Sequence, residues 1–241
     1  MNPCLIYISG NNPATHYAGR FLQEAGYAVT ETPSGDVTHA LLPVPYFEDS
    51  KLWDEAAAKL PIDVTIFGGS LTGPGFTGYQ TVDLLKNEYY LAENAAITAD
   101  CAVRIAGSHL GVVFRDCPVL VLGCGRIGKC LAKVLAALGA EVTVAARKET
   151  DRAMAQALGY HISDFSGDFS KYRLIFNTAP APVLPEMQLP NCIKIDLASQ
   201  KGIAGNDMIW ARGLPGKMLP ESSGKLIAKT VLDLLSQEAG A

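Results

Sequence analysis

The sequence lacks the residue spacings that usually hold a metal ion. Its six cysteines are scattered without a C-x-x-C pair, and its four histidines stand far apart without an H-E-x-x-H pattern. We therefore expect no metal site. Because no disulfide framework is apparent, we also expect the cysteines to be reduced thiols.

Long apolar runs and basic stripes are missing too. No stretch approaches the ~20 apolar residues of a membrane-spanning helix, and the chain start has no basic segment of the kind that opens a signal peptide. The net charge of −4 comes without clustered Lys and Arg among aromatics, which argues against nucleic-acid binding. These absences predict a cytoplasmic protein that binds neither membrane nor nucleic acid.

The chain does have enough apolar sequence for a large core. It has 241 residues, of which 49% are hydrophobic and 18% charged. Strand-like and helix-like segments alternate with short connections, which predicts an α/β fold with a doubly wound parallel sheet. We predict a smaller N-terminal α/β domain over residues 1–93, a connector helix over 94–109, a Rossmann dinucleotide-binding domain over 110–220 and a C-terminal helix over 221–241.

One glycine-rich stretch organises the second predicted domain. An apolar run over residues 119–122 leads into Gly123-Cys124-Gly125-Arg126-Ile127-Gly128, and apolar residues then recur at helical spacing. Gly123 would allow a sharp turn, Gly125 would let a pyrophosphate approach the backbone, and Gly128 would let the helix pack closely. The helix N-terminus, including Arg126 and Ile127, would offer N–H groups to the phosphates. The stretch predicts a dinucleotide site.

The end of the next predicted strand, over residues 141–145, indicates which dinucleotide binds. An NAD site usually carries Asp or Glu about 20 residues after the glycines. This chain instead has Arg147 and Lys148, followed by Thr150. Because a guanidinium binds phosphate in a bidentate manner, the pattern favours NADP over NAD.

Two further loops follow predicted strands of the same sheet. Asn177-Thr178-Ala179-Pro180 follows one strand, and Ser199 follows Asp196 at the end of the next. Ligands of doubly wound sheets lie at the carboxyl ends of the strands. We therefore expect Asn177, Thr178, Ala179 and Pro180 to contact the cofactor, and Ser199 the substrate.

The connector helix and the C-terminal helix supply the remaining candidates. Thr98 is placed to cap the connector helix, with Asp100 in the first turn of that helix. Ser222 and Ser223 are placed at the start of the C-terminal helix. Such residues are often only caps or helix-dipole partners. With Lys217 nearby, they would also suit a carboxylate. The candidate substrate contacts are Thr98, Ser199, Lys217, Ser222 and Ser223, and the candidate catalytic residues are Asp100 and Lys217.

Taken in order, these loops resemble the A subunit of dipicolinate synthase. The resemblance covers roughly residues 98–235, and matches residues 42–44 and 67–70 more loosely. It rests on Val121-Leu122-Gly123 through Gly128, Ala146-Arg147, Phe176-Asn177-Thr178-Ala179-Pro180, Ile195-Asp196-Leu197-Ala198-Ser199 and Gly213-Leu214-Pro215-Gly216-Lys217.

The resemblance implies a specific reaction. The family oxidises a dihydrodipicolinate-level intermediate of the lysine pathway to dipicolinate in spore-forming bacteria. It implies an NADP-dependent oxidoreductase subunit that acts on a small dicarboxylate and works with a flavoprotein-like B subunit. We also expect a homo-oligomer. The chain departs from the family in a shorter first domain, and in Ile97-Thr98-Ala99-Asp100-Cys101 where the family has P-T-V-E-G. These departures bear more on the substrate than on the cofactor.

Two alternatives stay open. One is another small-molecule NAD(P)-dependent dehydrogenase on the same fold, although no His or Arg–Glu set suited to a hydroxy acid stands on the cleft-forming segments. The other is a non-catalytic NADP-binding assembly or regulatory subunit, which the scarcity of an acid–base pair favours.

Overall fold

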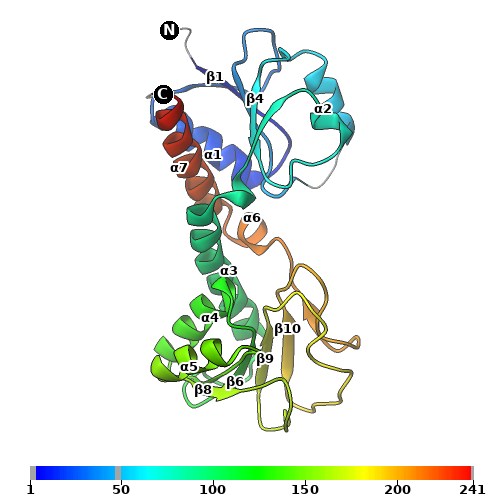
Figure 1. Ribbon diagram of the computed structural model, residues 1–241, viewed down its shortest axis with the longest axis vertical. Helices are drawn as coiled ribbons and strands as arrows, with labels where there is room; N and C mark the ends of the chain where they lie inside the picture. Colours follow the sequence, from blue (N-terminus) through cyan, green and yellow to red (C-terminus); the bar gives the residue numbers. More distant parts are fainter. Residues whose placement is uncertain (1–3, 47–49, 240–241) are drawn as a thin grey trace. The chain divides into compact units, whose positions relative to one another are not determined.

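The computed structural model describes residues 4–46 and 50–239. The chain forms two compact units, each built on a parallel sheet (Figure 1). The first unit comprises residues 1–94 and 215–241, and the second comprises residues 95–214. The predicted α/β class with two parallel sheets is therefore confirmed. Within the described ranges, no helix is both long and apolar enough to cross a membrane.

The first unit has a five-stranded sheet in the order β2-β1-β3-β4-β5. All its strand pairs are parallel. The winding direction reverses between β1 and β3, as in other doubly wound sheets. The strands are β1 (Leu5–Ile8), β2 (Ala28–Thr30), β3 (His39–Leu41), β4 (Thr65–Gly68) and β5 (Gln80–Asp83), and the helices are α1 (Pro13–Glu24), α2 (Ser50–Ala57), α6 (Leu214–Met218, which starts at the unit boundary) and α7 (Pro220–Ala239).

Side chains on the two faces of this sheet pack against different helices. On one face, Tyr7 and Ile66 join a core with Trp53 of α2 and with Phe76 of the 3₁₀ turn η1 (Pro74–Phe76). On the other face, α1 lies close to β1, because a Cβ at Gly19 would be only 3.1 Å from Ile8 Cγ1. Alternation of side chains along each strand places these contacts on opposite faces.

The C-terminal helix α7 returns to the first unit and packs along α1 (Figure 1). A Cβ at Gly224 would lie 2.5 Å from Tyr17 Cβ and 2.6 Å from the Ala14 carbonyl oxygen. The two helix backbones therefore approach closely at a point where only glycine fits.

The second unit has a six-stranded parallel sheet in the order β11-β10-β9-β6-β7-β8. Counted from β6, this is the strand order 3-2-1-4-5-6 of dinucleotide-binding Rossmann domains. The strands are β6 (Pro118–Leu122), β7 (Glu141–Ala145), β8 (His161–Ser163), β9 (Leu174–Asn177), β10 (Ile193–Asp196) and β11 (Ile209–Trp210), and the helices are α4 (Arg126–Ala137) and α5 (Glu149–Ala157).

Irregular segments cover one face of this second sheet. Parallel strands are usually joined by a helix, yet no helix occurs between β8 and β11 in this fully described stretch. Instead, Phe169, Tyr172, Leu184 and Ile203 from the loops pack on Ile175 and its neighbours. The core on this face therefore depends on loop side chains.

The helix α3 (Glu88–His109) begins earlier than the predicted connector helix. Asn87 caps the N-terminus of this helix, because its side-chain oxygen accepts a hydrogen bond from Tyr90 N at 2.9 Å. Thr98 is buried inside the helix. The prediction that Thr98 caps this helix is therefore wrong.

Two other predicted boundaries are corrected by local hydrogen bonds. The sequence over residues 81–86 predicts a strand, but β5 ends at Asp83, because the Asp83 carboxylate accepts a hydrogen bond from Leu85 N at 2.9 Å and turns the chain into the 3₁₀ turn η2 (Leu84–Lys86). The helix α7 starts at Pro220, so Ser222 and Ser223 lie in its first turn. Ser223 N already donates to the Leu219 carbonyl at 3.0 Å, and neither serine is the cap. The short strands β8 and β11 were not predicted.

Candidate cofactor-binding site

The glycine turn of the second unit joins β6 to α4 in the predicted manner. Gly123 has φ of 107°, and its N–H donates to the Ala145 carbonyl at 2.8 Å. A Cβ at Gly123 would lie 2.6 Å from Thr178 Oγ1, and one at Gly128 would lie 2.2 Å from the Gly123 carbonyl oxygen. Both glycines are therefore required by the turn itself.

Gly125 differs from Gly123 and Gly128 because there is open space where its Cβ would be. No atom lies within 4 Å of the position of a Cβ there. Gly125 is the N-cap of α4, and no side chain caps the helix. The first N–H groups of α4, from Arg126, Ile127 and Gly128, thus form an end suited to a phosphate.

The loop after β9 lies directly against this turn. Thr178 N donates to the Leu122 carbonyl at 2.8 Å, and its hydroxyl lies 3.1 Å from the same oxygen. Because β6 and β9 are neighbours at the point where the strand order reverses, this contact lies where doubly wound folds bind ligands. Residues 178–180 and the glycine turn therefore belong to one site.

Asn177 has its side chain fully engaged inside the protein. Its Nδ2 donates to the Ala179 carbonyl at 3.0 Å and to Asp196 Oδ1 at 2.9 Å, while its Oδ1 accepts from Ala179 N at 2.9 Å. The side chain is completely buried. Asn177 therefore shapes the loop, and its contact with the cofactor stays a prediction.

The Asp196 carboxylate organises the adjacent loop. It accepts hydrogen bonds from the backbone N–H groups of Ala198 at 3.0 Å, Gly202 at 2.7 Å and Ile203 at 2.9 Å, in addition to the Asn177 amide. A Cβ at Gly202 would lie 2.4 Å from Asn177 Nδ2. The sequence pattern placed Asp196 at a strand end, but these partners are separated in sequence and no pattern indicated them.

The strand β7 is followed by the cationic segment that is predicted to select NADP over NAD. Ala146 is buried, and Arg147, Lys148 and Thr150 are exposed. A residue not predicted, Arg152 of α5, donates from Nη1 to the carbonyls of Ala146 at 2.7 Å and Arg147 at 2.8 Å. Its position one helical turn after Lys148 is the only signal that the sequence offered.

The cysteine inside the glycine turn is uncharged at neutral pH. Burial raises the pKa of the Cys124 thiol, and the nearby Asp151 carboxylate raises it further. A protonated thiol places no negative charge beside the phosphate-binding N–H groups. Burial likewise raises the pKa of Cys101 and of Cys192 to about 11.

The candidate substrate residues divide between the two units. Thr98, Asp100 and Ser199 lie in the second unit, and Lys217, Ser222 and Ser223 lie in the first. Thr98 and Ser223 are buried, whereas the other four are exposed. Since residues two apart on a helix face different directions, Thr98 and Asp100 do not share a face of α3. Convergence of these residues on one substrate stays a prediction.

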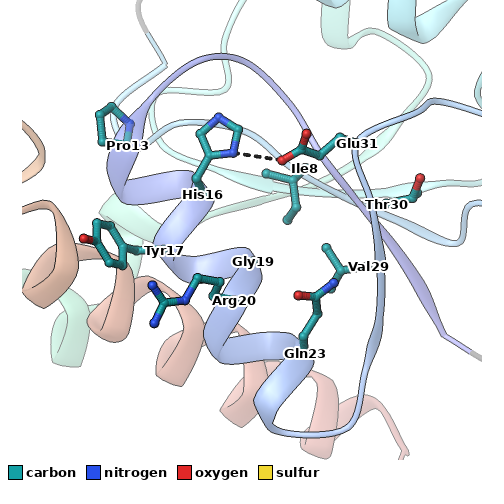
Figure 2. Close-up of a pocket in the computed structure, with 10 residues that line it drawn as sticks. All are labelled: Ile8, Pro13, His16, Tyr17, Gly19, Arg20, Gln23, Val29, Thr30 and Glu31. Carbon is teal, nitrogen blue, oxygen red and sulfur yellow. Dashed lines mark hydrogen bonds and ion pairs between the residues drawn. The ribbon is translucent and has the colours of Figure 1, made fainter.

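The first unit holds a separate pocket of about 380 Å³ between α1 and β2 (Figure 2). Ile8 and Val29 contribute apolar surface, and the hydrogen bond between His16 Nδ1 and Glu31 Oε1, at 3.1 Å, lies beside them. None of the predicted site residues lines it. Among residues 4–46 and 50–239, no three His, Cys, Asp or Glu side chains are grouped to hold a metal ion.

Comparison with known proteins places the glycine turn in a nicotinamide-binding context. Residues 100–183 match the D-isomer specific 2-hydroxyacid dehydrogenase, NAD binding domain. This match supports a nicotinamide dinucleotide as the cofactor of this chain. It does not distinguish NADP from NAD.

The chain is also similar to the A subunit of dipicolinate synthase. It is 28% identical to that protein from Bacillus subtilis over 173 residues, which cover 65% of this chain and 58% of the relative's length. The aligned region therefore spans under two thirds of the curated relative. The resemblance stated from the loop motifs is confirmed.

Solved structures show the same fold over nearly the whole chain. The A subunit of dipicolinate synthase from Bacillus halodurans matches with a TM-score of 0.85 at 23% identity, covering 97% of this chain and 98% of that chain. Its counterpart in dipicolinate synthase from Bacillus subtilis matches with a TM-score of 0.80 at 21% identity, covering 100% and 99%. A transhydrogenase from Sinorhizobium meliloti matches with a TM-score of 0.74 at 12% identity, covering 98% and 94%. Together the comparisons support an oxidoreductase-like protein.

Proposed function

We propose that this chain is an NADP-dependent oxidoreductase subunit that oxidises a dihydrodipicolinate-level intermediate to dipicolinate. The observation that carries the proposal is the open end of α4 at Gly125, beside a β7 strand end that is cationic. The similarity to the A subunit of dipicolinate synthase supports the substrate class.

The residues after β7 support NADP as the cofactor. Where an NAD site usually carries a carboxylate, this chain has the buried Ala146 followed by the exposed Arg147 and Lys148. Neither exposed side chain has an ion pair within the described part of the chain, so both are available to a 2′-phosphate. Thr150, in the first turn of α5, would add a hydroxyl.

The proposed reaction does not require a strong general acid or base from the protein. Oxidation of a dihydropyridine removes a hydride and a proton and leaves an aromatic ring, so the driving force is large. The bound nicotinamide would accept the hydride. The chain's own residues would hold the ring in place through its two carboxylates, with Lys217 binding one of them as a cation, and the Asp100 carboxylate would take the proton.

A non-catalytic NADP-binding subunit is the second candidate. It is favoured by the hydrogen bonding of the polar side chains next to the glycine turn. Asn177, Thr178 and Asp196 all make hydrogen bonds to other parts of the protein. The remaining alternative, another NAD(P)-dependent dehydrogenase, would share the same cofactor contacts.

The name of the relative supports a multi-subunit enzyme, because that protein is itself one subunit of a synthase. We accordingly propose that the partner is a flavoprotein-like B subunit. We further propose a homo-oligomeric state, a cytoplasmic location and a role in spore formation.

Titration with NADP and NAD tests the cofactor. The native protein should bind NADP more tightly, and Arg147→Asp should weaken NADP by about 10- to 100-fold, the loss expected for one charge-assisted contact. Arg173→Asp is the matched control, since Arg173 is exposed at the opposite, amino end of the same sheet. Tighter binding of NAD by the native protein would contradict the proposal.

A single-turnover assay separates the enzyme from the alternatives. The chain is mixed with NADP and a dihydrodipicolinate-forming system, with and without the B subunit, and the absorbance of reduced nicotinamide is followed. Reduction of NADP is expected. If NADP binds normally but is not reduced in either mixture, the assembly-subunit function is favoured.

A further inference from the structure

Arg152 is held against the segment that is proposed to choose the cofactor. Its Nη1 donates to two consecutive carbonyls, those of Ala146 and Arg147, at 2.7 and 2.8 Å. These carbonyls follow directly on the carboxyl end of β7, which is the edge where doubly wound sheets bind ligands. The guanidinium is therefore fixed at the ligand side of the sheet.

Most of the donors of this guanidinium remain available. An arginine side chain carries five N–H donors in a rigid fork. Nη1 supplies the two hydrogens that meet the carbonyls, which leaves those of Nη2 and Nε. Within the described residues neither atom has a protein partner. A fork anchored on one side and open on the other is suited to bind a phosphate oxygen pair.

The charge of Arg152 is also largely uncompensated. Carbonyl groups are neutral, and no carboxylate forms an ion pair with Arg152 in the part of the chain that the structure describes. The Arg152 charge also acts on Asp164, which follows β8. Hydrogen bonds from Ser166 Oγ at 2.6 Å and Ser166 N at 2.8 Å lower the pKa of Asp164, and the Arg152 charge makes a smaller contribution in the same direction.

We propose that Arg152 is a second specificity residue, whose free Nη2 and Nε bind the 2′-phosphate of NADP together with Arg147. This inference rests on the proposed function, because it assumes that the second unit binds NADP. It adds a residue outside the exposed cationic segment. Arg152 would bind the phosphate from α5, and would also fix the backbone from which the Arg147 side chain projects.

The test compares affinities for NADP and NAD in Arg152→Gln, with Arg173→Gln as the control that removes the same charge from the amino end of the sheet. Arg152→Gln should weaken NADP by about 10-fold or more, while NAD changes little, since NAD lacks the phosphate. Arg173→Gln should change neither affinity. The ratio of the two affinities is the decisive readout.

A purely structural role gives a different result. If Arg152 only supports the loop, Arg152→Gln weakens NADP and NAD equally, the ratio is unchanged and the inference is overturned while the NADP site stands. If the native protein binds NAD more tightly than NADP, the proposed function is itself wrong.

A second measurement separates direct phosphate binding by Arg152 from support of the Arg147 backbone, and it also applies if Arg152→Gln fails to fold. A structure of the native protein with NADP bound should place Nη2 or Nε within hydrogen-bonding distance of the 2′-phosphate. A 2′-phosphate that contacts Arg147 but not Arg152 would overturn the inference without any substitution.

Discussion

Gly125 and Gly128 stand three residues apart in one turn but have opposite surroundings. A Cβ at Gly128 would lie 2.2 Å from a carbonyl oxygen of the same turn, whereas a Cβ at Gly125 would meet nothing within 4 Å. Gly125 also has an extended backbone, with φ −78° and ψ −168°, that any residue adopts. The fold thus requires Gly128, and only a ligand would require Gly125.

Substituting the two glycines separates fold from binding. Gly125→Val should cost about 1 kcal/mol in the free energy of unfolding, because valine is a poorer N-cap residue than glycine, but should abolish NADP binding because the branched side chain occupies the pyrophosphate position. Gly128→Ala should cost at least ~2 kcal/mol, because backbone atoms cannot move away from the new Cβ. Denaturant unfolding and NADP titration measure the two effects.

The outcome that would contradict this assignment is specific. Unchanged NADP affinity in Gly125→Val would show that the phosphates bind elsewhere. Gly35→Ala serves as the control, since no atom lies within 4 Å of the Cβ position at Gly35 and its backbone is not left-handed. It should affect neither property.

Single residues differed in how far the sequence predicted them. The glycines could be predicted because their spacing within one turn is itself the signal. Arg152 and the bond between Asn177 and Asp196 could not, because each depends on which distant backbone groups the fold brings near. Asn177 was predicted to touch the cofactor for its position at a strand end, and that position is correct.

At the scale of elements, the irregular segments between β9 and β11 are joined by a buried lysine. Lys194 of β10 is 2% exposed, and its Nζ donates to the Met187 carbonyl at 2.9 Å and to Asp207 Oδ2 at 2.5 Å. Met187 precedes β10 and Asp207 follows it. One ammonium group therefore ties the two segments to the strand between them.

This contact predicts a pH dependence of stability. The Lys194 ammonium group, through its hydrogen bond and charge, lowers the pKa of Asp207. A carboxylate whose pKa is lowered by folding stabilises the fold above its unfolded pKa of about 3.9, and the effect is lost as pH falls through the lower folded value. Asp207→Asn should lower Tm by a few degrees at neutral pH, and the difference should shrink below about pH 4.

Thermal unfolding over a pH series measures this effect. Glu186→Gln is the control, because Glu186 is an exposed carboxylate of the same loops without an ion pair in the described part of the chain. Its Tm difference should be small at every pH. A Tm difference for Asp207→Asn that stays constant down to pH 3 would show that the charge of Asp207 does not act through Lys194.

Elements with a clear period were predicted, and elements defined by tertiary contacts were not. The apolar patterns of the strand β6 and the helix α4 are long enough to predict a strand and a helix from the sequence. The strand β8 has three residues and β11 has two, and both exist only because they pair with a neighbouring strand. Because no helix occurs between β8 and β11, the sequence there has no helical period to detect.

At the scale of the whole molecule, the chain crosses between its units twice. It leaves the first unit within α3 and returns to it at Pro215. The sequence predicted a C-terminal helix but did not indicate the element against which this helix packs. Gly224 explains why α7 can pack against α1, since the close approach of α7 to Ala14 and Tyr17 requires a glycine at this position.

This return places Lys217 and Ser222 in the first unit while the cofactor residues lie in the second. A substrate with two carboxylates would need one contact group for each. The exposed Lys217 and Ser222 of the first unit would supply a cation and a hydroxyl for these contacts.

Lys217→Ala and Ser222→Ala test this site directly. Each should weaken dipicolinate binding by about 10- to 100-fold, because a hydrogen bond to a charged group is worth ~1.5–3 kcal/mol, while NADP binding stays normal. Both side chains are exposed, so folding should not be affected. Lys59→Ala, another exposed lysine of the first unit, is the control and should leave both ligands unchanged. If neither variant alters dipicolinate binding or turnover with the B subunit present, the site must be abandoned in favour of the assembly-subunit function.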